Sequence, residues 1–373
     1  MSQRLLTQRA RNRALLARQG LLERWACPVP RAVERMGGIQ AQYAPSSYVA
    51  LWSRLEGFRR ADLDRALSRR TVVQATLMRA TIHLVSAADF WPLADAIRGP
   101  RLAWFLRVQR SGRGPDALHA AAQAAEAALR DGPLRQHELD ALVEKAIRPA
   151  IGMYVDLVRV PPAGTWAQRR ADLYGLADDW LPRAPGEVPD PVDQTARLVR
   201  RYLGAFGPAH RRDIATWAGV KVRDVTPALD RLELRTFRAE DGGELVDLPR
   251  APVPEPGTPA PVRFLPTWDA ALLTHCRGAG LLPEQHRAAI FSTKNPFSLG
   301  TVLVDGKVRA TWRPLEDRIE VTELDVLDRA ARTAVADEAD RLAAFHRECD
   351  LGCLPRAVRW RASSRRRPAP SRR

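Results

Sequence analysis

Two glutamines separated by one residue form the most unusual polar pattern in this sequence. Gln40 and Gln42 lie in the segment 37–45, Gly-Gly-Ile-Gln-Ala-Gln-Tyr-Ala-Pro. In an extended segment, residues i and i+2 project from the same face, so both amides would point the same way. A glutamine amide both donates and accepts hydrogen bonds, so two adjacent amides can hold one water molecule in a fixed direction. Neither amide deprotonates water at neutral pH, and such a pair therefore suits a reaction whose leaving group is already activated.

Loop glutamines are common on protein surfaces, so this pattern alone leaves a structural role open. Other catalytic signatures are absent from the sequence, which has no phosphate-binding loop, no Rossmann glycine fingerprint and no Gly-x-Ser-x-Gly. His346, Cys349 and Cys353 could share a helix face, but a zinc site needs four ligands at regular spacing. We therefore expect free thiols in a reducing compartment, no metal and no other cofactor.

The segments around the glutamines predict short helices followed by a strand. The expected helices cover Pro30–Met36, Ser46 or Ser47 to about residue 55, and Ala61–Ser68. A β-branched stretch, Val72–Val85, predicts a strand, and Ser86 with Asp89 forms a capping box for a helix to Ile97. This order predicts a first winged-helix domain over residues 1–112.

Three polar residues of the predicted strand 72–85 alternate onto one face. They are Arg79, Thr81 and His83. Such a face can present polar groups to DNA, which makes all three candidate DNA-binding residues. His83 lies between Ile82 and Leu84, so a structural histidine and a phosphate-contacting one are both open, and both are favoured over a catalytic one.

An internal repeat indicates two further winged helices. Residues 189–250 contain predicted helices Gln194–Ala205, Arg211–Ala218 and Val222–Leu232, followed by two strands around Asp241-Gly242-Gly243. Asp-Gly and Gly-Gly are hairpin turn signals, and three helices with a hairpin are typical of a winged helix-turn-helix. The same order, with a matching Gly-Pro pair, occurs at 113–188.

The remaining sequence predicts a small β-rich, barrel-like domain over residues 262–347. Its strands Gly300–Val304 and Lys307–Trp312 are joined by Asp305-Gly306, and a helix over 325–346 closes the domain. The tail 361–373 is rich in arginine, serine and proline, which predicts a disordered polycation. The expected fold class is α+β, with tandem winged helices and a C-terminal β-domain.

Composition indicates a folded protein with affinity for polyanions. The 373 residues are 45% hydrophobic and 27% charged, and the formal net charge is +16. All but four of the 59 basic residues are arginine, and codon usage accounts for part of that excess. No apolar run reaches 18 residues and the N-terminus lacks a secretory h-region. We therefore expect a cytoplasmic, nucleoid-associated protein with no membrane partner.

Several segments resemble the AlkZ family of bacterial DNA glycosylases. The similarity lies in Gly38–Ser46 running into Leu51–Arg54, and in Met78–Asp89. It continues in Phe264-Leu265-Pro266 with Trp268-Asp269-Ala270, Lys294-Asn295-Pro296, Gly300–Gly306 and Thr311-Trp312-Arg313. These matches occur in the family's order over roughly residues 5–345.

The resemblance implies that Gln40, Ala41 and Gln42 form the family's glutamine–apolar–glutamine motif, with Gln40 and Gln42 catalytic. Glutamine at position 42 places the chain with AlkZ rather than with the related AlkX branch, which carries aspartate there. The family architecture implies three winged helices and a C-terminal β-domain around a basic, C-shaped channel. The implied reaction is hydrolysis of the N-glycosidic bond of an N7- or N3-alkylated purine in double-stranded DNA.

The resemblance also implies bulky adducts or interstrand crosslinks as substrates, in self-resistance to a DNA-alkylating natural product. A housekeeping role on simple methylpurines is equally open. No lysine is near the glutamines, so we expect a monofunctional enzyme that leaves an abasic site. The hairpin Thr301–Trp312, with Lys307, Arg309 and Arg313, is the candidate element for engaging the duplex, although it could merely close the β-domain.

Two other hypotheses for the function remain open. A winged-helix transcription regulator or architectural protein would bind duplex DNA without chemistry and would be indifferent to changes at Gln40 and Gln42. Regulators usually need a dimer interface or an effector pocket, and neither can be identified in this sequence. We therefore expect a monomer. A lesion-binding protein with an inactive site would bind alkylated DNA and release nothing.

Overall fold

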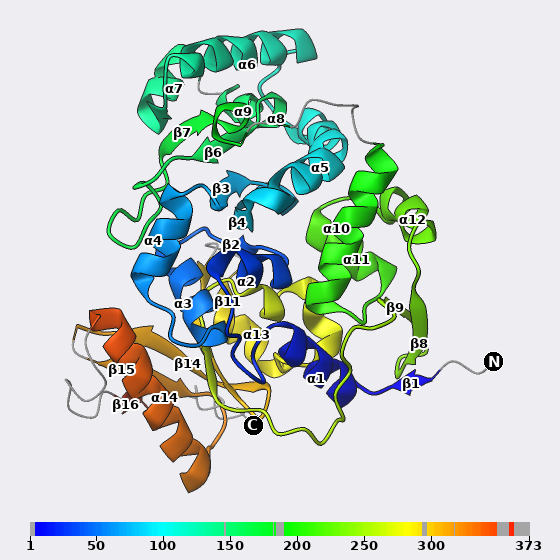
Figure 1. Cartoon of the computed structure of the whole chain (residues 1–373), viewed down its shortest axis with the longest axis vertical. Helices are drawn as coiled ribbons and strands as arrows, with labels where there is room; N and C mark the ends of the chain where they lie inside the picture. The colour runs from blue at the N-terminus through cyan, green and yellow to red at the C-terminus, as the bar shows by residue number, and fades with distance from the viewer. Residues whose placement is uncertain are drawn as a thin grey trace, which may run out of the picture. The chain divides into compact units, whose positions relative to one another are not determined.

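Helices and mixed sheets alternate along the chain (Figure 1). The computed structural model describes residues 4–144, 147–181, 183, 190–292, 297–316, 318–348 and 358–361. The chain divides into two units. The first comprises Met1–Thr258 and Trp268–Gly280, and the second comprises Pro259–Thr267 and Leu281–Arg373. The fold is mixed α/β.

The first hundred residues contain most of the elements that hold the glutamine motif. They are β1 (Leu5–Leu6), α1 (Gln8–Arg18), α2 (Val29–Arg35), β2 (Ile39–Gln40), α3 (Ala44–Arg54), α4 (Arg60–Ser68), β3 (Val72–Thr76), η1 (Met78–Ala80), β4 (Ile82–Ser86) and α5 (Ala87–Val108). The Ser86 hydroxyl accepts from the Asp89 N–H, which confirms the predicted start of α5. That helix continues past Ile97 and Pro100 to Val108, so its predicted end was wrong.

Two further local predictions were wrong. Helix α3 begins at Ala44 rather than at Ser46 or Ser47, because Pro45 occupies its first turn, where a missing N–H is tolerated. The predicted strand 72–85 is broken by the one-turn 3-10 helix η1, in which Arg79 and Ala80 both have φ of 55°. Left-handed backbone at two adjacent residues cannot continue a strand.

A single six-stranded sheet runs through residues 39–176. The middle segment contains α6 (Pro115–Arg130), β5 (Leu134–Arg135), α7 (Gln136–Leu142), η2 (Arg148–Ala150), α8 (Ile151–Tyr154), β6 (Leu157–Arg159), β7 (Leu173–Leu176) and α9 (Ala177–Trp180). The strand order is β2-β4-β3-β6-β7-β5, and β3 pairs with β6 through Gln74↔Arg159 and Ala75↔Val158. The strands of the predicted first and second domains therefore form one sheet, at the top of Figure 1.

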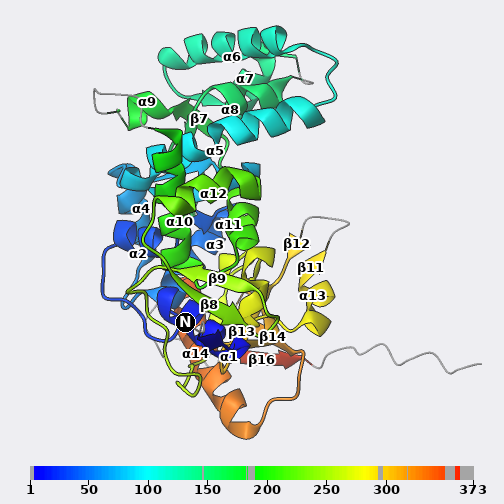
Figure 2. The ribbon, with the colours of Figure 1, turned by 90° about the vertical axis from the view of Figure 1, so that its right-hand side faces the viewer.

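Residues 191–247 have the predicted order of three helices and a hairpin. The elements are α10 (Pro191–Phe206), α11 (Arg211–Ala218), α12 (Val222–Asp230), β8 (Arg235–Ala239) and β9 (Glu244–Asp247). Buried residues of α10 recur every three or four positions, as expected for a helix with one face in the core. Strand β1 pairs in parallel with β8, which the sequence did not indicate; both lie near the N-terminus in Figure 2.

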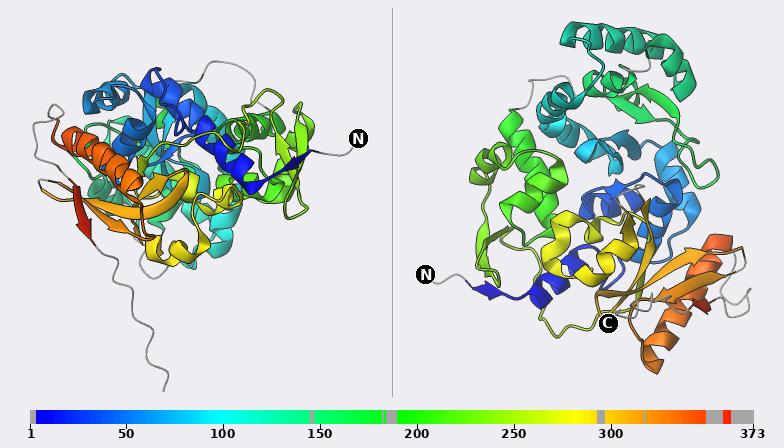
Figure 3. Two further views of the ribbon diagram at one scale, coloured as in Figure 1. Left: turned by 90° about the horizontal axis from the view of Figure 1, so that it is seen from below. Right: turned by 180° about the vertical axis from the view of Figure 1, so that it is seen from behind.

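The second unit is built on an open sheet, so the barrel prediction was wrong. The elements after residue 258 are β10 (Arg263–Leu265), η3 (Ala270–Leu272), η4 (Thr274–Ala279), α13 (Glu284–Ile290), β11 (Phe291–Ser292), β12 (Phe297–Ser298), β13 (Gly300–Val304), β14 (Lys307–Pro314), β15 (Ile319–Glu323), α14 (Arg329–Arg347) and β16 (Val358–Arg361). The sheet order is β10-β13-β14-β15-β16, and its two end strands do not pair with each other. Helix α14 packs along this sheet (Figure 3).

The tight turn between β13 and β14 confirms a sequence prediction. Asp305 and Gly306 have φ of 46° and 73°, as expected for an Asp-Gly hairpin turn. The segment Lys294-Asn295-Pro296, Cys349, Cys353 and the tail from 362 lie outside the described residues. Within the described residues, no helix is long and apolar enough to cross a bilayer, and no cluster of His, Cys, Asp and Glu could hold a metal ion.

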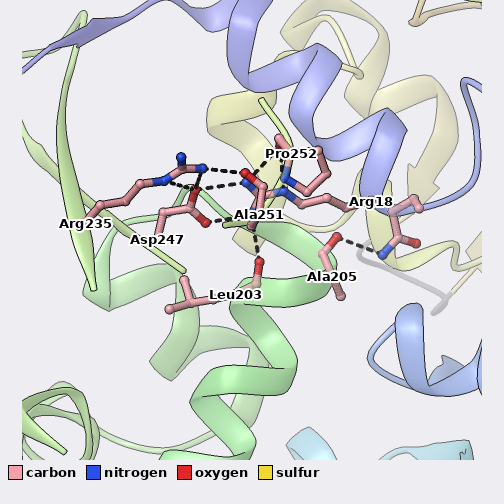
Figure 4. A network of polar contacts seen from close by, with 8 residues as sticks. Arg18, Leu203, Ala205, Arg235, Asp247, Ala251 and Pro252 are labelled. Atoms are coloured by element: carbon pink, nitrogen blue, oxygen red, sulfur yellow. Dashed lines mark hydrogen bonds and ion pairs between the residues drawn. The ribbon is translucent and has the colours of Figure 1, made fainter. Parts of the chain in front are cut away.

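A buried ion pair fastens α1 to the β8–β9 hairpin (Figure 4). Arg18 donates from Nη1 and Nη2 to the two Asp247 carboxylate oxygens at 2.6 and 2.9 Å. Arg235 donates to the same carboxylate at 2.7 and 3.1 Å. The Arg18 guanidinium also donates to the carbonyls of Leu203 and Pro252. One carboxylate thus holds a helix, a hairpin and a following loop through two arginines.

We expect Asp247→Asn to destabilise the protein by about 3 kcal/mol or more, because it leaves the buried Arg18 charge uncompensated. Urea unfolding of the full chain measures this loss. The matched control is Glu144→Gln, which breaks the exposed Arg113–Glu144 pair and should cost about 0–1 kcal/mol. Equal small losses in both variants would contradict a structural role for the buried pair.

Candidate active site

A two-glycine turn places the glutamine motif beside β4. Helix α2 ends at Arg35, and Gly37 and Gly38 follow with φ of 72° and 85°. A Cβ on Gly38 would approach Val85 Cγ1 to 3.2 Å, so both the backbone angle and the close packing favour glycine. The chain then pairs antiparallel with β4, with Gln40 opposite His83. The Ala41 N–H extends this pairing by donating to the Ile82 carbonyl at 2.8 Å.

Both glutamine side chains accept hydrogen bonds, Gln40 from η1 and Gln42 from the first residue of β4. Arg79 Nη2 donates to Gln40 Oε1 at 3.1 Å, and the Ile82 N–H donates to Gln42 Oε1 at 3.0 Å. A guanidinium and a backbone N–H only donate, so these contacts identify the oxygen end of each amide. Within the described residues, neither amide nitrogen has a hydrogen-bond partner. Each glutamine therefore keeps an unused N–H₂ group in a defined orientation.

The two glutamines differ in burial. Gln40 is 8% exposed, whereas Gln42 is exposed at the end of the paired segment. The short extension beyond β2 explains this difference, because the chain leaves the sheet after Ala41 to enter α3. Gln40 is thus the buried member of the pair and Gln42 the solvent-accessible one.

Arg79 ties Gln40 to another part of the first unit. Its Nη1 donates to the Trp217 carbonyl in the last turn of α11. Gly219 caps that helix with φ of 76°, and a Cβ there would come within 2.9 Å of the Arg79 backbone nitrogen. Burial lowers the pKa of Arg79 to about 10, so its guanidinium stays charged at neutral pH. The sequence pointed to Arg79 as a DNA contact and gave no sign of this bridging position.

Two buried histidines near Arg79 are neutral. His83 is 2% exposed, and its Nδ1 lies 2.9 Å from the Thr81 carbonyl, which requires the proton on Nδ1. Burial, and secondarily the Arg79 charge, lowers the His83 pKa to about 3. Burial and the same charge hold the His275 pKa well below its ordinary value. His275, whose buried Nε2 has no hydrogen-bond partner among the described residues, carries no spacing signal in the sequence.

This arrangement can orient a molecule but contains no strong base. Within the described residues, no carboxylate hydrogen-bonds to Gln40 or Gln42. A neutral imidazole with a pKa near 3 is too weak a base to take a proton from water at neutral pH. What remains is a set of fixed amide dipoles at the edge of a buried positive charge. Such a site can direct a water molecule and stabilise developing charge through dipoles.

The predicted DNA-binding residues fall into two groups. Arg79, Thr81 and His83 lie beside the glutamines in the first unit, where the Thr81 hydroxyl donates to the Met78 carbonyl. The other three are on β14 of the second unit, which lies between two strands of the open sheet. There Lys307 is exposed, whereas Arg309 binds Asp325 at 3.3 Å and Arg313 binds Glu320 at 2.7 Å.

Comparison with known proteins identifies the family. A family model described as DNA glycosylase AlkZ-like matches residues 33–345, which include both glutamines. The chain belongs to the AlkZ-like DNA glycosylase family. It is therefore a DNA glycosylase, a hydrolase of N-glycosyl bonds, as the resemblance of the glutamine segment implied.

Two relatives come from Streptomyces sahachiroi. The interstrand DNA cross-link repair glycosylase of that organism is 22% identical over an alignment of 361 residues, and the match covers 88% of this chain and 93% of the relative. The solved structure of the S. sahachiroi DNA glycosylase AlkZ superposes with a TM-score of 0.76 at 18% identity. That match covers 96% of this chain and 100% of the solved one, and it shows a shared fold.

The neutral state of His83 predicts how the stability of this AlkZ-like protein depends on pH. Below pH 6.5 the unfolded chain protonates His83 and the folded protein does not, so stability falls as pH falls toward 3. Each fully coupled proton contributes a slope of about 1.4 kcal/mol per pH unit. Urea unfolding between pH 6.5 and 4.5 should show a shallower slope for His83→Asn. The exposed control His137→Asn should not change the slope, and identical slopes in all three proteins would refute the assignment.

Proposed function

We propose that this AlkZ-like enzyme releases N7- or N3-alkylated purines from double-stranded DNA, with Gln40 and Gln42 orienting the attacking water. The observation that carries this proposal is the fixed orientation of the two amides beside neutral histidines. Gln40 is held by Arg79 and Gln42 by the backbone of Ile82, so their free N–H₂ groups are set before substrate arrives. Preorganised dipoles lose little free energy to reorientation during the reaction.

The chemistry of an alkylated purine matches a site without a strong base. Alkylation at N7 or N3 makes the base cationic, so it departs as a neutral molecule and needs no general acid. The sugar then carries oxocarbenium character, and an oriented water completes the hydrolysis at C1′. A neutral base such as uracil lacks this activation and should not be released. We expect a monofunctional reaction that leaves an abasic site and an uncut strand.

The relative named for interstrand cross-link repair supports a wider substrate range. We infer that bulky N7 adducts and crosslinks are substrates, and that the enzyme serves as self-resistance to a DNA-alkylating natural product. A crosslinked base cannot be flipped into a closed pocket, so this range requires the base to be reached from an open surface. Such an open surface is the C-shaped channel implied by the family, which stays a prediction. The net charge of +16 supports binding of duplex DNA, and we propose that the enzyme acts as a monomer.

The order of helices and strands supports a second candidate function, which involves no catalysis. Helices α10, α11 and α12 followed by the β8–β9 hairpin have the order of a winged helix, and we interpret this segment and its two upstream counterparts as winged helices. A transcription regulator or architectural protein built this way would bind intact duplex. It would protect specific sequences and would tolerate changes at Gln40 and Gln42.

Base release from a duplex containing 7-methylguanine separates these candidates. We expect Gln40→Ala and Gln42→Ala each to lower the single-turnover rate ten-fold or more, which is about 1.4 kcal/mol of barrier. Abasic sites are scored as heat- or base-labile breaks over time, and uracil-containing duplex is the negative substrate. A crosslinked duplex is the next substrate. Binding without release of 7-methylguanine or of a bulky N7 adduct would exclude the glycosylase proposal for these lesions.

Arg79 should act on the reaction through Gln40. We expect Arg79→Met to lower the release rate ten-fold or more in the wild-type background and less than two-fold in Gln40→Ala, because the amide it positions is then absent. The exposed control Arg65→Met should leave the rate unchanged. Additive losses in the double variant would show that Arg79 contributes independently of Gln40, for instance by contacting DNA.

A further inference from the structure

A second polar site lies where strand β3 pairs with strand β6. A cavity of about 220 Å³ opens there within the first unit, between the sheet and the segment containing α7, η2 and α8. Liquid water takes about 30 Å³ per molecule, so this space admits a small organic molecule. Gln40, Gln42 and Arg79 do not line it.

Two buried guanidiniums line this cavity. Arg101 on α5 is 7% exposed and Arg159 on β6 is 6% exposed. Within the described residues neither forms an ion pair. Both donate to Thr76, Arg101 to its carbonyl at 2.7 Å and Arg159 to its hydroxyl at 3.0 Å. The two guanidiniums thus approach β3 at the same residue, Thr76.

Polar atoms of both arginines remain unused. Arg101 Nε, Arg159 Nε and Arg159 Nη1 are buried without a hydrogen-bond partner in the described part of the chain. The other charged groups of the cavity are already engaged. Asp156 accepts from Arg98 at 2.5 Å, and Arg148 donates to Asp140 at 2.9 Å. The unused donors therefore call for an acceptor from outside the protein.

The walls of the cavity define the rest of the ligand. They are mainly apolar and include Phe90, Leu139, Met153 and Val155. The Arg159 guanidinium lies 5.2 Å from the centre of the Tyr174 ring, which forms another flat wall. Apolar walls with a few convergent polar groups are typical of small-molecule sites. A DNA phosphate fits poorly, because its strongly hydrated sugar-phosphate backbone gains nothing from such walls.

We propose that this cavity binds a small organic carboxylate whose compact apolar body packs against the cavity walls while its carboxylate bridges Arg101 and Arg159. This site is separate from the glutamine motif, and its existence does not depend on the proposed reaction. A ligand here would join the two halves of the six-stranded sheet, because Arg159 belongs to β6 and Thr76 to β3. The ligand would thus stabilise the junction of the first two predicted domains.

The test uses the full-length wild-type protein with benzoate as probe and benzamide as its neutral, isosteric control. We expect millimolar benzoate to raise the melting temperature and to bind in calorimetry, and benzamide to do neither. Arg101→Met and Arg159→Met should each weaken benzoate binding at least ten-fold. The highly exposed control Arg170→Met should not.

The wild-type comparison keeps the proposal falsifiable if a variant fails to fold. Equal responses to benzoate and benzamide would overturn it, as would no response to benzoate or binding that survives both arginine substitutions. Inorganic phosphate and unmodified duplex DNA are tested as further ligands of the wild-type protein. Binding of phosphate but not benzoate, displaced by duplex, would also overturn it and would make the two arginines a DNA-backbone contact.

Discussion

The glutamine motif depends on one half-buried cation. Burial lowers the pKa of the Arg79 guanidinium to about 10, so the group remains charged at neutral pH. A charge in that position requires oxygen acceptors, and it finds them in Gln40 Oε1 and the Trp217 carbonyl. Three features meet at Arg79: the orientation of the Gln40 amide, the left-handed backbone of η1 and the close approach of α11 at Gly219. The rest of the site is arranged around this constraint.

This charge also determines what chemistry its surroundings permit. Burial keeps His83 and His275 neutral and this charge adds to the effect, so the site disfavours any reaction that would place additional cations beside it. Departure of a neutral base would create a separated cation and anion. Departure of a cationic base only moves an existing positive charge from base to sugar, so the total charge in the site stays constant. Fixed dipoles suffice for that second case, so the reaction we propose can proceed with a pair of amides and without a carboxylate.

Local sequence signals predicted individual helices and turns well. They predicted less well how strands distant in the sequence pair with one another. Helix α11 has its predicted bounds, Ser86 caps α5, and Asp305-Gly306 forms the expected turn, because each depends on neighbours in the sequence. The break at η1, the parallel pairing of β1 with β8 and the seam between β3 and β6 depend on contacts between distant residues. The glutamines were recognisable from their spacing and family resemblance. Their partner Arg79 was visible only as a polar residue of a predicted strand, since its bridge to Trp217 spans 138 residues.

Three arginines of this chain differ in how completely neighbouring groups compensate their positive charge. Arg18 meets both oxygens of a carboxylate, and its pair holds α1 to a hairpin. Arg79 meets two neutral oxygens, one of them on a residue of the proposed catalytic motif. Arg159 meets only the neutral side chains of Thr76 and Tyr174 and keeps two unused nitrogens. The electrostatic cost of burial rises along this series, since neutral acceptors stabilise a guanidinium less than a carboxylate does. Among these three arginines, the one paired with a carboxylate joins structural elements, and the two that meet only neutral groups lie where we propose that substrate or ligand binds.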